Sequence, residues 1–315
     1  MNNENWEVII IGGGSGGLSA ALTLVRARRR VLVIDSSSPR NRVSGHMHAV
    51  LGHDGKPPLQ LLAEGREEIA RYGGVVRSGA VVATTAVKGG FSVECSDGET
   101  FTARALIIAT GLEDQLPEIE GLGEVWGSGV AVCPYCDGYE VGDGRIGILA
   151  TGPGSTFQAQ LLRQWSPQIV YLENDVGIPT AEAGPGLAAR GIEVISGAVA
   201  RVLSSNGQLT GVELASGEHI PLDAIFTAPR FAPRDEPLRQ ISADRTDFPW
   251  GSFATVDAAG RTSVPGVWAV GNVVDANASV SVTIGAGALA GGMLNHELIL
   301  EDIQVAVTAM AEVNK

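Results

Sequence analysis

The stretch Glu7-Val-Ile-Ile-Ile-Gly12-Gly13-Gly14-Ser15-Gly16-Gly17 lies near the start of the chain and decides its fold. A β-branched run ends in G-x-G-x-x-G, and an Ala/Leu-rich stretch follows over Leu18–Arg28. A second apolar run, Val31–Ile34, then ends at Asp35. Strand, glycine loop, helix, strand and acid at this spacing are typical of a dinucleotide-binding unit. We therefore predict a Rossmann-like α/β fold that begins here.

Each glycine of the G-x-G-x-x-G pattern has a physical task. Gly12 permits the tight turn, Gly14 lets the backbone approach a pyrophosphate, and Gly17 lets the helix close on the strand. The helix N-terminus adds partial positive charge beside the phosphates, and Asp35 would accept hydrogen bonds from a ribose. This unit by itself does not distinguish FAD from NAD.

The bulk composition excludes several classes of protein. A chain of 315 residues with 44% apolar and 18% charged residues suits about two globular domains. The net charge of −13 argues against a nucleic acid or an anionic membrane as partner. No signal peptide or membrane span is expected, because the start has no basic region and the uncharged stretch before His296 is rich in glycine. Three cysteines, two of them in a C-x-x-C, favour a reducing compartment, so we expect a cytoplasmic protein.

A second strand–loop–helix–strand pattern occupies the middle of the chain. Its strands are expected over Arg145–Ala150 and Ile169–Leu172, with a helix over Gln158–Trp165. We place the third glycine position of its loop at Phe157, whose bulk would oppose close packing of helix on strand and would crowd a pyrophosphate.

Before this second pattern stands the sequence Cys133-Pro134-Tyr135-Cys136-Asp137. Two thiols at this spacing can close a small disulfide, and exchange chemistry needs a thiolate nucleophile and a good leaving thiol. Asp137 is a candidate general acid/base, a role that would need a pKa raised by burial. The alternative for Asp137 is an N-cap of the turn that follows.

Two further predicted strands end in a turn with a glycine and a short polar side chain, at Thr110-Gly111 and at Gly271-Asn272. Together with the N-terminal unit and the Cys-x-x-Cys-Asp, in this order, they resemble the low-molecular-weight thioredoxin reductases among the FAD-dependent pyridine nucleotide-disulfide oxidoreductases. The resemblance covers essentially the whole chain. It implies an FAD domain made of residues 1–115 and 237–315, and an inserted NAD(P)H-domain-like unit, residues 116–236, that carries the dithiol. The Pro-containing stretches 112–118 and 229–237 would be the hinge.

The resemblance also implies a flavin site. Gly271 and Asn272 match the Gly-Asp that contacts the ribityl chain and pyrophosphate, although Asn272 carries no charge. A helix starting near Val280, where the family usually has Gln, would bring its positive end to the flavin. The full set of expected cofactor contacts is Gly12, Gly14, Ser15, Gly16, Gly17, Asp35, Ser36, Arg40, Asn41, His48, Val82, Thr110, Gly111, Gly271, Asn272, Ser281 and Val282.

By the same resemblance, Cys136 would face the flavin, Cys133 would exchange with substrate, and Asp137 would move protons for the thiols and the reduced flavin. The histidine-rich segment 46–53 could instead supply a zinc site with the two cysteines. A loop that covers the flavin, as in the family, explains this segment without a metal, and we assign no metal site.

One departure from the family bears on the electron donor. Thioredoxin reductases have a His-Arg-Arg cluster for the 2′-phosphate of NADPH, where this chain has Glu173-Asn174-Asp175. Two carboxylates repel a phosphate, which argues against NADPH, whereas Glu173 has the spacing of a ribose partner, so NADH stays possible.

An intact dithiol beside an altered NADPH site resembles the dithiol oxidases of the holomycin/gliotoxin type, which close disulfides in natural products. We therefore predict that a small-molecule dithiol reduces the Cys133–Cys136 disulfide, and that electrons pass to FAD and then to O2, giving hydrogen peroxide. A reductase that uses NADH, NADPH or ferredoxin, with a thioredoxin-like protein as partner, is one alternative. A flavin-thiol redox sensor is another. The family resemblance implies a homodimer.

Overall fold

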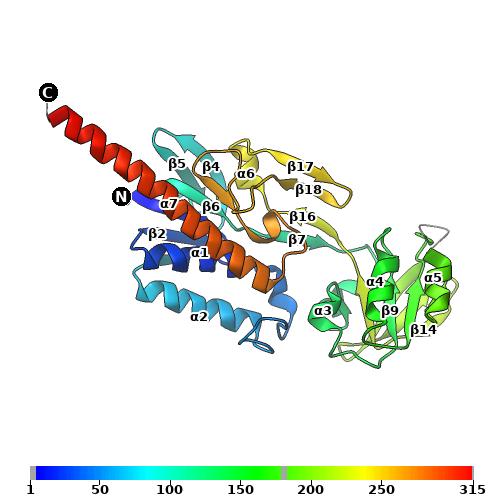
Figure 1. The fold of residues 1–315 in the computed structure, drawn as a ribbon. Coiled ribbons are helices and arrows are strands. Elements are labelled where there is room, and N and C mark those ends of the chain that lie inside the picture. The colour runs from blue at the N-terminus through cyan, green and yellow to red at the C-terminus, as the bar shows by residue number, and fades with distance from the viewer. Residues whose placement is uncertain (1–4, 179–182, 314–315) are drawn as a thin grey trace. The chain divides into compact units, whose positions relative to one another are not determined.

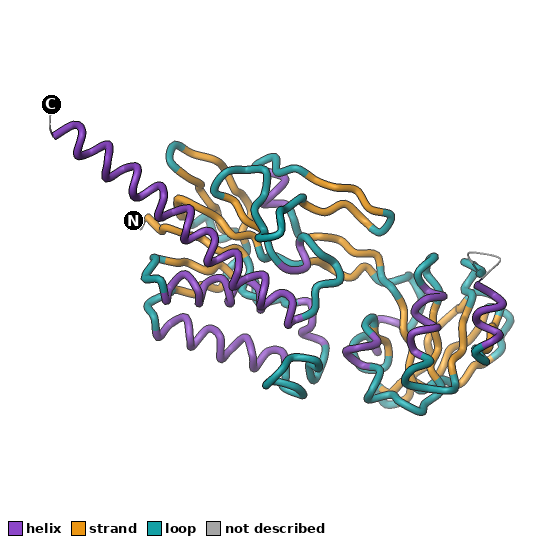
Figure 2. Tube along the Cα trace, viewed as in Figure 1, coloured by secondary structure: helices purple, strands orange, loops and turns teal. Residues whose placement is uncertain are grey.

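The computed structural model describes residues 5–178 and 183–313, and the chain forms two compact units (Figures 1 and 2). The first unit comprises Met1–Arg40, Leu59–Glu113 and Phe231–Lys315, and the second comprises Asn41–Pro58 and Asp114–Arg230. These limits differ from the expected domain limits at residues 41–58, 114–115 and 231–236. Residues 41–58 group with the second unit, where Val43 lies against Gly127. Phe231 groups with the first unit, where it packs against Leu112 and Phe253.

A seven-stranded sheet forms the centre of the first unit, in the order β3-β2-β1-β6-β5-β4, with β19 also paired to β6. The strands β3, β2, β1, β6 and β19 run parallel, whereas β5 and β4 extend the sheet as antiparallel strands. The central strands read as continuous β-branched runs because helices or loops cover both of their faces. The bounds are β1 Asn5–Ile11, β2 Val31–Asp35, β3 Val75–Ser78, β4 Val81–Val87, β5 Gly90–Cys95, β6 Thr100–Ile108 and β19 Val267–Ala269.

Three helices accompany this sheet: α1 Ser15–Arg26, α2 Pro58–Arg71 and α7 Val280–Val313. In α1 the buried residues Leu18, Ala21 and Leu24 follow a helical period and join one core with residues of the sheet. Helix α7 runs alongside α1 (Figure 1), and its backbone approaches so closely that a Cβ at Gly291 would lie 2.8 Å from the Ala20 carbonyl oxygen. Beyond residue 298 every described residue of α7 is exposed.

The remaining elements of the first unit are helix α6 Glu236–Gln240 and the hairpin of β17 Arg245–Phe248 and β18 Gly251–Ala254. Leu238, Ala243 and Ala254 from this region pack on the second face of the large sheet. The uncharged stretch of α7 before His296 is buried along one face only. Among the helices that the structure describes, none combines the length and apolar composition needed to cross a membrane.

The second unit has a five-stranded sheet in the order β11-β10-β9-β15-β8, with every neighbouring pair parallel. Residues such as Ile148 and Phe226 pack under the helices, whereas their neighbours Leu149 and Ile225 pack against a three-stranded sheet, β12-β13-β14. The bounds are β8 Val130–Ala131, α3 Pro134–Asp137, β9 Ile146–Leu149, α4 Ser155–Leu162, β10 Ile169–Leu172, α5 Ala183–Ala189, β11 Glu193–Ile195, β12 Val199–Ser205, β13 Gln208–Leu214, β14 His219–Pro221 and β15 Ala224–Thr227. The predicted α/β class with two Rossmann-like sheets is confirmed.

The two stretches expected to connect the domains are strands that pair with each other. Strand β7, Leu112–Gln115, and strand β16, Arg230–Pro233, form a separate two-stranded sheet. The Arg234 N–H also donates to the carbonyl of Gly111 at 3.0 Å. Backbone pairing therefore joins the outgoing and returning chain.

Candidate active site

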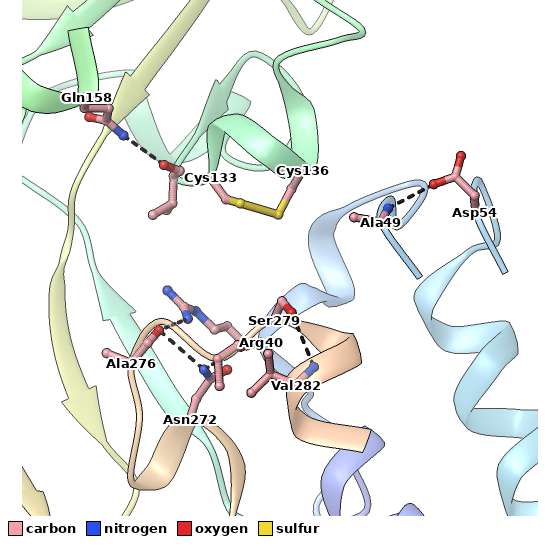
Figure 3. Close-up of a disulfide and its surroundings, with 12 residues drawn as sticks. Arg40, Ala49, Asp54, Cys133, Cys136, Gln158, Asn272, Ala276, Ser279 and Val282 are labelled. Atoms are coloured by element: carbon pink, nitrogen blue, oxygen red, sulfur yellow. Dashed lines mark hydrogen bonds between the residues drawn. A yellow bond between two sulfur atoms is a disulfide. The ribbon is translucent and has the colours of Figure 1, made fainter. Parts of the chain in front are cut away.

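Cys133 and Cys136 form a disulfide, with their Cα atoms 5.3 Å apart (Figure 3). Strand β8 ends at Ala131, and Cys133 is the N-cap of the short helix α3, which begins with Pro134. Proline suits this first helical position because its fixed φ is already helical and its missing N–H has no partner there. The N–H of Cys136 donates to the Cys133 carbonyl at 3.0 Å, which brings the two residues one turn apart. Both cysteines are half-buried.

Helix α4 supports the dithiol from one side. The side-chain Nε2 of Gln158 donates to the carbonyl of Val132 at 2.8 Å, directly before Cys133 (Figure 3). Tyr135 meets the ring of Trp165 edge to face, with ring centroids 5.6 Å apart. A Cβ at Gly138 would lie 3.1 Å from the Trp165 ring, so only glycine lets the chain leave α3 this close to Trp165. The sequence contained no signal for the role of Gln158.

Asp137 is the last residue of α3 and is half-buried. Cys133 is the N-cap of α3, so Asp137 does not cap this helix, and its alternative role as N-cap of the turn that follows stays a prediction. Burial raises the pKa of the Asp137 carboxyl to about 6, with a further upward effect of Glu140 and an opposing effect of His48. A carboxyl group with such a pKa can exchange protons near neutral pH.

In the first unit, the loop after β1 has the shape of a phosphate cradle. Gly12 has φ +107°, and a Cβ there would overlap the carbonyl of Ala109. A Cβ at Gly17 would overlap the Gly12 carbonyl, so α1 closes on the strand as predicted. Around Gly14, by contrast, no atom lies within 4 Å of a Cβ position, which leaves the space that an approaching pyrophosphate needs.

Asp35 stands at the end of β2, as the fingerprint requires. Its Oδ1 accepts the N–H of Gly13 at 3.0 Å, and its Oδ2 lies 2.8 Å from Arg66 on α2. Arg66 is a residue that sequence reasoning missed, because only the packing of α2 brings it to Asp35. Ser36 follows Asp35 and is exposed.

The N-termini of α1 and α7 meet at this cradle. The hydroxyls of Ser15 and Thr283 are 2.7 Å apart, and a Cβ at Gly16 would lie 3.2 Å from the Thr283 carbonyl oxygen. The Val282 N–H donates to Ser279 Oγ at 3.4 Å, at the first turn of α7 (Figure 3). Two helix N-termini side by side add their partial positive charges, which favours an anionic group. Ser281 belongs to the same turn.

The turn at Gly271 and Asn272 precedes α7 in the chain, and the side chain of Asn272 stabilises it. Gly271 has φ +77°, and Asn272 Nδ2 donates to the carbonyls of Asp275 at 2.9 Å and Ala278 at 3.0 Å. Arg40 NH1 donates to the carbonyl of Ala276 at 2.9 Å (Figure 3). The amide of Asn272 therefore holds a loop together, a role that the sequence comparison with a Gly-Asp did not suggest.

The other expected cofactor contacts are spread over both units. Thr110 has a buried Oγ1 without a hydrogen-bond partner, next to Gly111 at φ +72°. Val82 lies on β4, and its carbonyl accepts a hydrogen bond from Gln240 at 3.0 Å. In the second unit, Asn41 lies in the 3-10 turn Arg40–Val43, and His48 contacts carboxylates there.

The residues of the first unit fit a flavin dinucleotide. The open space at Gly14, the unpartnered hydroxyl of Thr110 and the paired helix N-termini are features that a bound pyrophosphate and its neighbouring groups would satisfy. In residues 5–178 and 183–313, no group of three or more His, Cys, Asp or Glu side chains is arranged to hold a metal ion.

In the second unit, the end of β9 corresponds to the end of β1. The Gly12 N–H donates to the Ile34 carbonyl at 2.8 Å, and the Ala150 N–H donates to the Leu172 carbonyl at 3.0 Å. Ala150 therefore takes the place of Gly12. It follows from the spacing that Gly152, Ser155 and Glu173 take the places of Gly14, Gly17 and Asp35.

The expected position of Phe157 at the third glycine is therefore wrong. Phe157 is 72% exposed and does not separate α4 from the sheet. The buried Ser155 stands at that position, and its Oγ accepts the N–H of Thr151 at 3.1 Å. Asn174 Nδ2 donates to the Ala150 carbonyl at 3.2 Å. Polar groups of the loop after β9 are therefore hydrogen-bonded within the second unit.

Comparison with known proteins agrees with this architecture. A family model described as pyridine nucleotide-disulphide oxidoreductase matches residues 6–311. The thioredoxin reductase tcpT of Claviceps purpurea is 40% identical over 151 residues, which are 47% of this chain and 47% of that protein, so the match spans about half of that relative's length. The thioredoxin reductase aclD of Aspergillus oryzae is 28% identical over 314 residues, covering 94% of this chain and 98% of that protein.

Two solved structures share the fold over nearly their full lengths. The crystal structure of HlmI has a TM-score of 0.94 at 41% identity and covers 100% of this chain and 99% of that one. An oxidoreductase from Agrobacterium tumefaciens has a TM-score of 0.88 at 36% identity, covering 94% and 99%. The chain therefore belongs to the pyridine nucleotide-disulphide oxidoreductase family and is a thioredoxin reductase-like flavoprotein.

Proposed function

We propose that this protein is an FAD-dependent dithiol oxidase, which closes an intramolecular disulfide in a small-molecule dithiol and releases hydrogen peroxide. In this proposal the inserted domain, residues 116–236, carries the thiols, and residues 1–115 and 237–315 hold FAD. The observation that carries the proposal is a Cys133–Cys136 disulfide with the titratable Asp137, next in the chain to a second nucleotide fold in which two carboxylates, Glu173 and Asp175, follow β10.

The exchange begins with a thiol of the substrate. Its thiolate attacks Sγ of Cys133, which forms a mixed disulfide, and Cys136 leaves as a thiolate. The second substrate thiolate then attacks the sulfur that is bound to Cys133. The substrate disulfide forms, and Cys133 leaves as a thiolate. The substrate loses two electrons and two protons, and the enzyme disulfide gains the two electrons.

Asp137 is the base of this exchange. Its carboxylate accepts the proton of the attacking thiol, and its pKa near 6 lets it ionise and reprotonate around neutral pH. Thiols of ordinary pKa are mostly protonated at that pH, so a nearby base raises the fraction of attacking thiolate. Gln158 keeps the chain before Cys133 in place through the Val132 carbonyl.

The flavin site is assigned to the residues that surround the glycine loop and the two helix N-termini. Gly14, Ser15 and the first turn of α7 would hold the pyrophosphate and the flavin end, and Asp35 would accept from the adenosine ribose. When bound there, FAD supplies a two-electron acceptor for the reduced dithiol and a donor for O2, which becomes hydrogen peroxide.

The second nucleotide fold supports a dithiol, and not NADPH, as electron source. Glu173 corresponds to Asp35 and would suit a ribose hydroxyl, but Glu173 and Asp175 would repel a 2′-phosphate. The Asn174 side chain is committed to Ala150 and Val199, so it also cannot bind a ligand without releasing them.

The names of two relatives favour a second candidate function. Both tcpT and aclD are named thioredoxin reductases. A thioredoxin reductase reduces a disulfide, which is the opposite direction of thiol–disulfide exchange. As such a reductase, this chain would take electrons from NADH, NADPH or ferredoxin and reduce a thioredoxin-like protein. For either function we propose a cytoplasmic homodimer.

An anaerobic mixing experiment separates these functions. Flavin-loaded protein is mixed with dithiothreitol, NADH or NADPH, the flavin absorbance is followed, and peroxide is measured after air is admitted. We expect dithiothreitol to bleach the flavin and air to give peroxide, with a Cys133→Ser variant inactive. Fast bleaching by a nicotinamide, followed by reduction of a thioredoxin, would replace the oxidase by the reductase. A single turnover with every donor would indicate a redox sensor.

A further inference from the structure

His48 is presented by a loop that holds its ring in one place. The carboxylate of Asp54 accepts the N–H of Ala49 at 2.9 Å (Figure 3), and its other oxygen lies 3.4 Å from His48 Nδ1. Ala49 has φ +58°, a conformation that residues other than glycine adopt when their surroundings hold them there. The loop therefore fixes both the backbone and one ring nitrogen of His48.

The other ring nitrogen faces the turn that follows the dithiol helix. His48 Nε2 lies 3.2 Å from Glu140 Oε1, and Glu140 comes three residues after Asp137. His46 is a further titratable neighbour, with its ring centroid 6.5 Å from that of His48. Because a neutral imidazole has a single N–H, only the protonated ring can donate to Asp54 and Glu140 at the same time.

The charges of this cluster act on Asp137. The Glu140 carboxylate opposes ionisation of Asp137, and burial opposes it more strongly. His48 acts in the opposite direction and lowers the pKa of Asp137. Loss of the imidazole would leave Asp137 with burial and a like charge as its dominant influences.

We propose that His48 is a positioning residue of the dithiol site, which holds Glu140 through Nε2 and keeps the Asp137 carboxylate available as a base. This inference rests on the base function proposed above for Asp137. It assigns His48 to the dithiol chemistry, whereas the sequence led us to expect a flavin contact. His48 acts through Asp137 and does not itself need to touch the substrate.

The test measures reduction of the Cys133–Cys136 disulfide by dithiothreitol, without O2 or flavin turnover. Free thiols are trapped by alkylation at set times and counted by mass spectrometry, from pH 5 to pH 8. The rate of each protein, divided by that of the same protein carrying Asp137→Asn, isolates the Asp137 effect. In the wild type this ratio should change with a midpoint near pH 6.

We expect His48→Gln to move this midpoint upward by about half to one pH unit, which is about a threefold to tenfold fall in the ratio of ionised to protonated Asp137. Glu140→Gln should move it downward, because a like charge is removed. Both shifts keep their direction whether Asp137 acts as an acid or as a base. His53→Gln, an exposed histidine of the same loop, is the matched control and should leave the midpoint in place.

A lower rate with an unmoved midpoint in His48→Gln would overturn the proposal, because a merely structural loop gives that result. A midpoint that does not fall in Glu140→Gln would also overturn it. If His48→Gln does not fold, Glu140→Gln still provides the test, since that side chain is 45% exposed. If Asp137→Asn matches the wild type at every pH, the base function of Asp137 fails first, and this outcome is distinct from an unmoved midpoint.

Discussion

The two nucleotide folds of this chain begin in the same way and differ in how they treat their loops. After β1 the turn needs a left-handed Gly12, and the space around Gly14 is open. After β9 the equivalent of Gly12 is Ala150, and Ser155 Oγ accepts the Thr151 N–H. The space is open at Gly14 and also at its equivalent Gly152, so the two loops differ in the residue at the turn and in the hydrogen bond of Ser155.

The same topology can be kept for separate reasons. In the first fold the glycines bring backbone and helix ends close enough to bind a dinucleotide. In the second fold the same arrangement of strand and helix supports a disulfide, through Gln158 at the Val132 carbonyl and Trp165 under Tyr135. We infer that damage to either fold should affect one property and spare the other.

The largest expected effect is the loss of flavin from Gly17→Ala. A Cβ at this position overlaps the Gly12 carbonyl, so α1 must move away from the strand and the cradle opens. We expect bound flavin to fall below about a tenth of the wild-type content, because close helix–strand packing positions the phosphate site. The ratio of flavin to protein absorbance in the purified variant measures this.

The matched control is Ser155→Ala at the equivalent position of the second fold. It removes one hydrogen bond, to the Thr151 N–H, and should cost about 0.5 to 1.5 kcal/mol without loss of flavin. A Gly17→Ala protein that keeps its full flavin content would break the comparison between the folds.

The next effect concerns Asp137, which should change the thiol chemistry and leave flavin content unchanged. The wild-type rate of dithiothreitol oxidation should rise through about pH 6, because the carboxylate form of Asp137 is the proposed base. Asp137→Asn should lose this rise and react about tenfold to a hundredfold more slowly at pH 7. Peroxide formation at a series of pH values measures both.

The same shift predicts a stability change with a definite sign. The folded-state pKa of Asp137 is raised above its ordinary value of 3.8, so ionisation of this group weakens the fold as pH rises from there through about 6. Asp137→Asn should therefore unfold at a higher denaturant concentration than the wild type above pH 6. An equal or lower midpoint would contradict the raised pKa.

A smaller effect is expected for Asn174→Ala in the second fold. Its carboxamide donates to the Ala150 carbonyl at 3.2 Å and accepts the Val199 N–H at 3.0 Å, so both partners lose a hydrogen bond. We expect the free energy of unfolding to fall by about 1 to 3 kcal/mol. Urea unfolding followed by tryptophan fluorescence tests this. Asp175→Asn is the control, because Asp175 has a positive φ and asparagine tolerates that conformation as well as aspartate does.

The smallest effect is expected where the two helix N-termini meet in the first fold. Removal of the hydrogen bond between Ser15 and Thr283 by Ser15→Ala and Thr283→Val should give a coupling energy of about 0.5 to 1.5 kcal/mol in a double-mutant cycle. Flavin affinity should fall a few-fold in the same variants. Thr308→Val, in the exposed part of α7, should leave flavin affinity unchanged.

Sequence reasoning located the elements well where the signal was local. The strand before Gly12, the helix after it and the acid Asp35 were all predicted, and the Cys133–Cys136 pair is a disulfide in the structure. It failed where two loops had to be superposed. Phe157 was placed at the third glycine because Gly152 and Gly154 suggested the register, whereas backbone hydrogen bonding identifies Ser155.

The βαβ units, the C-x-x-C and the family could be predicted from the residues alone, because glycine conformations, apolar runs and thiol spacing act over a few residues. The partners of the reactive groups could not be predicted, because they come from distant parts of the chain. Arg66 reaches Asp35 because α2 packs beside β2, and His48 reaches Glu140 across 92 positions of chain. The pKa of Asp137 depends on its burial and on the charges of Glu140 and His48, and no local sequence pattern predicts the burial or the position of His48.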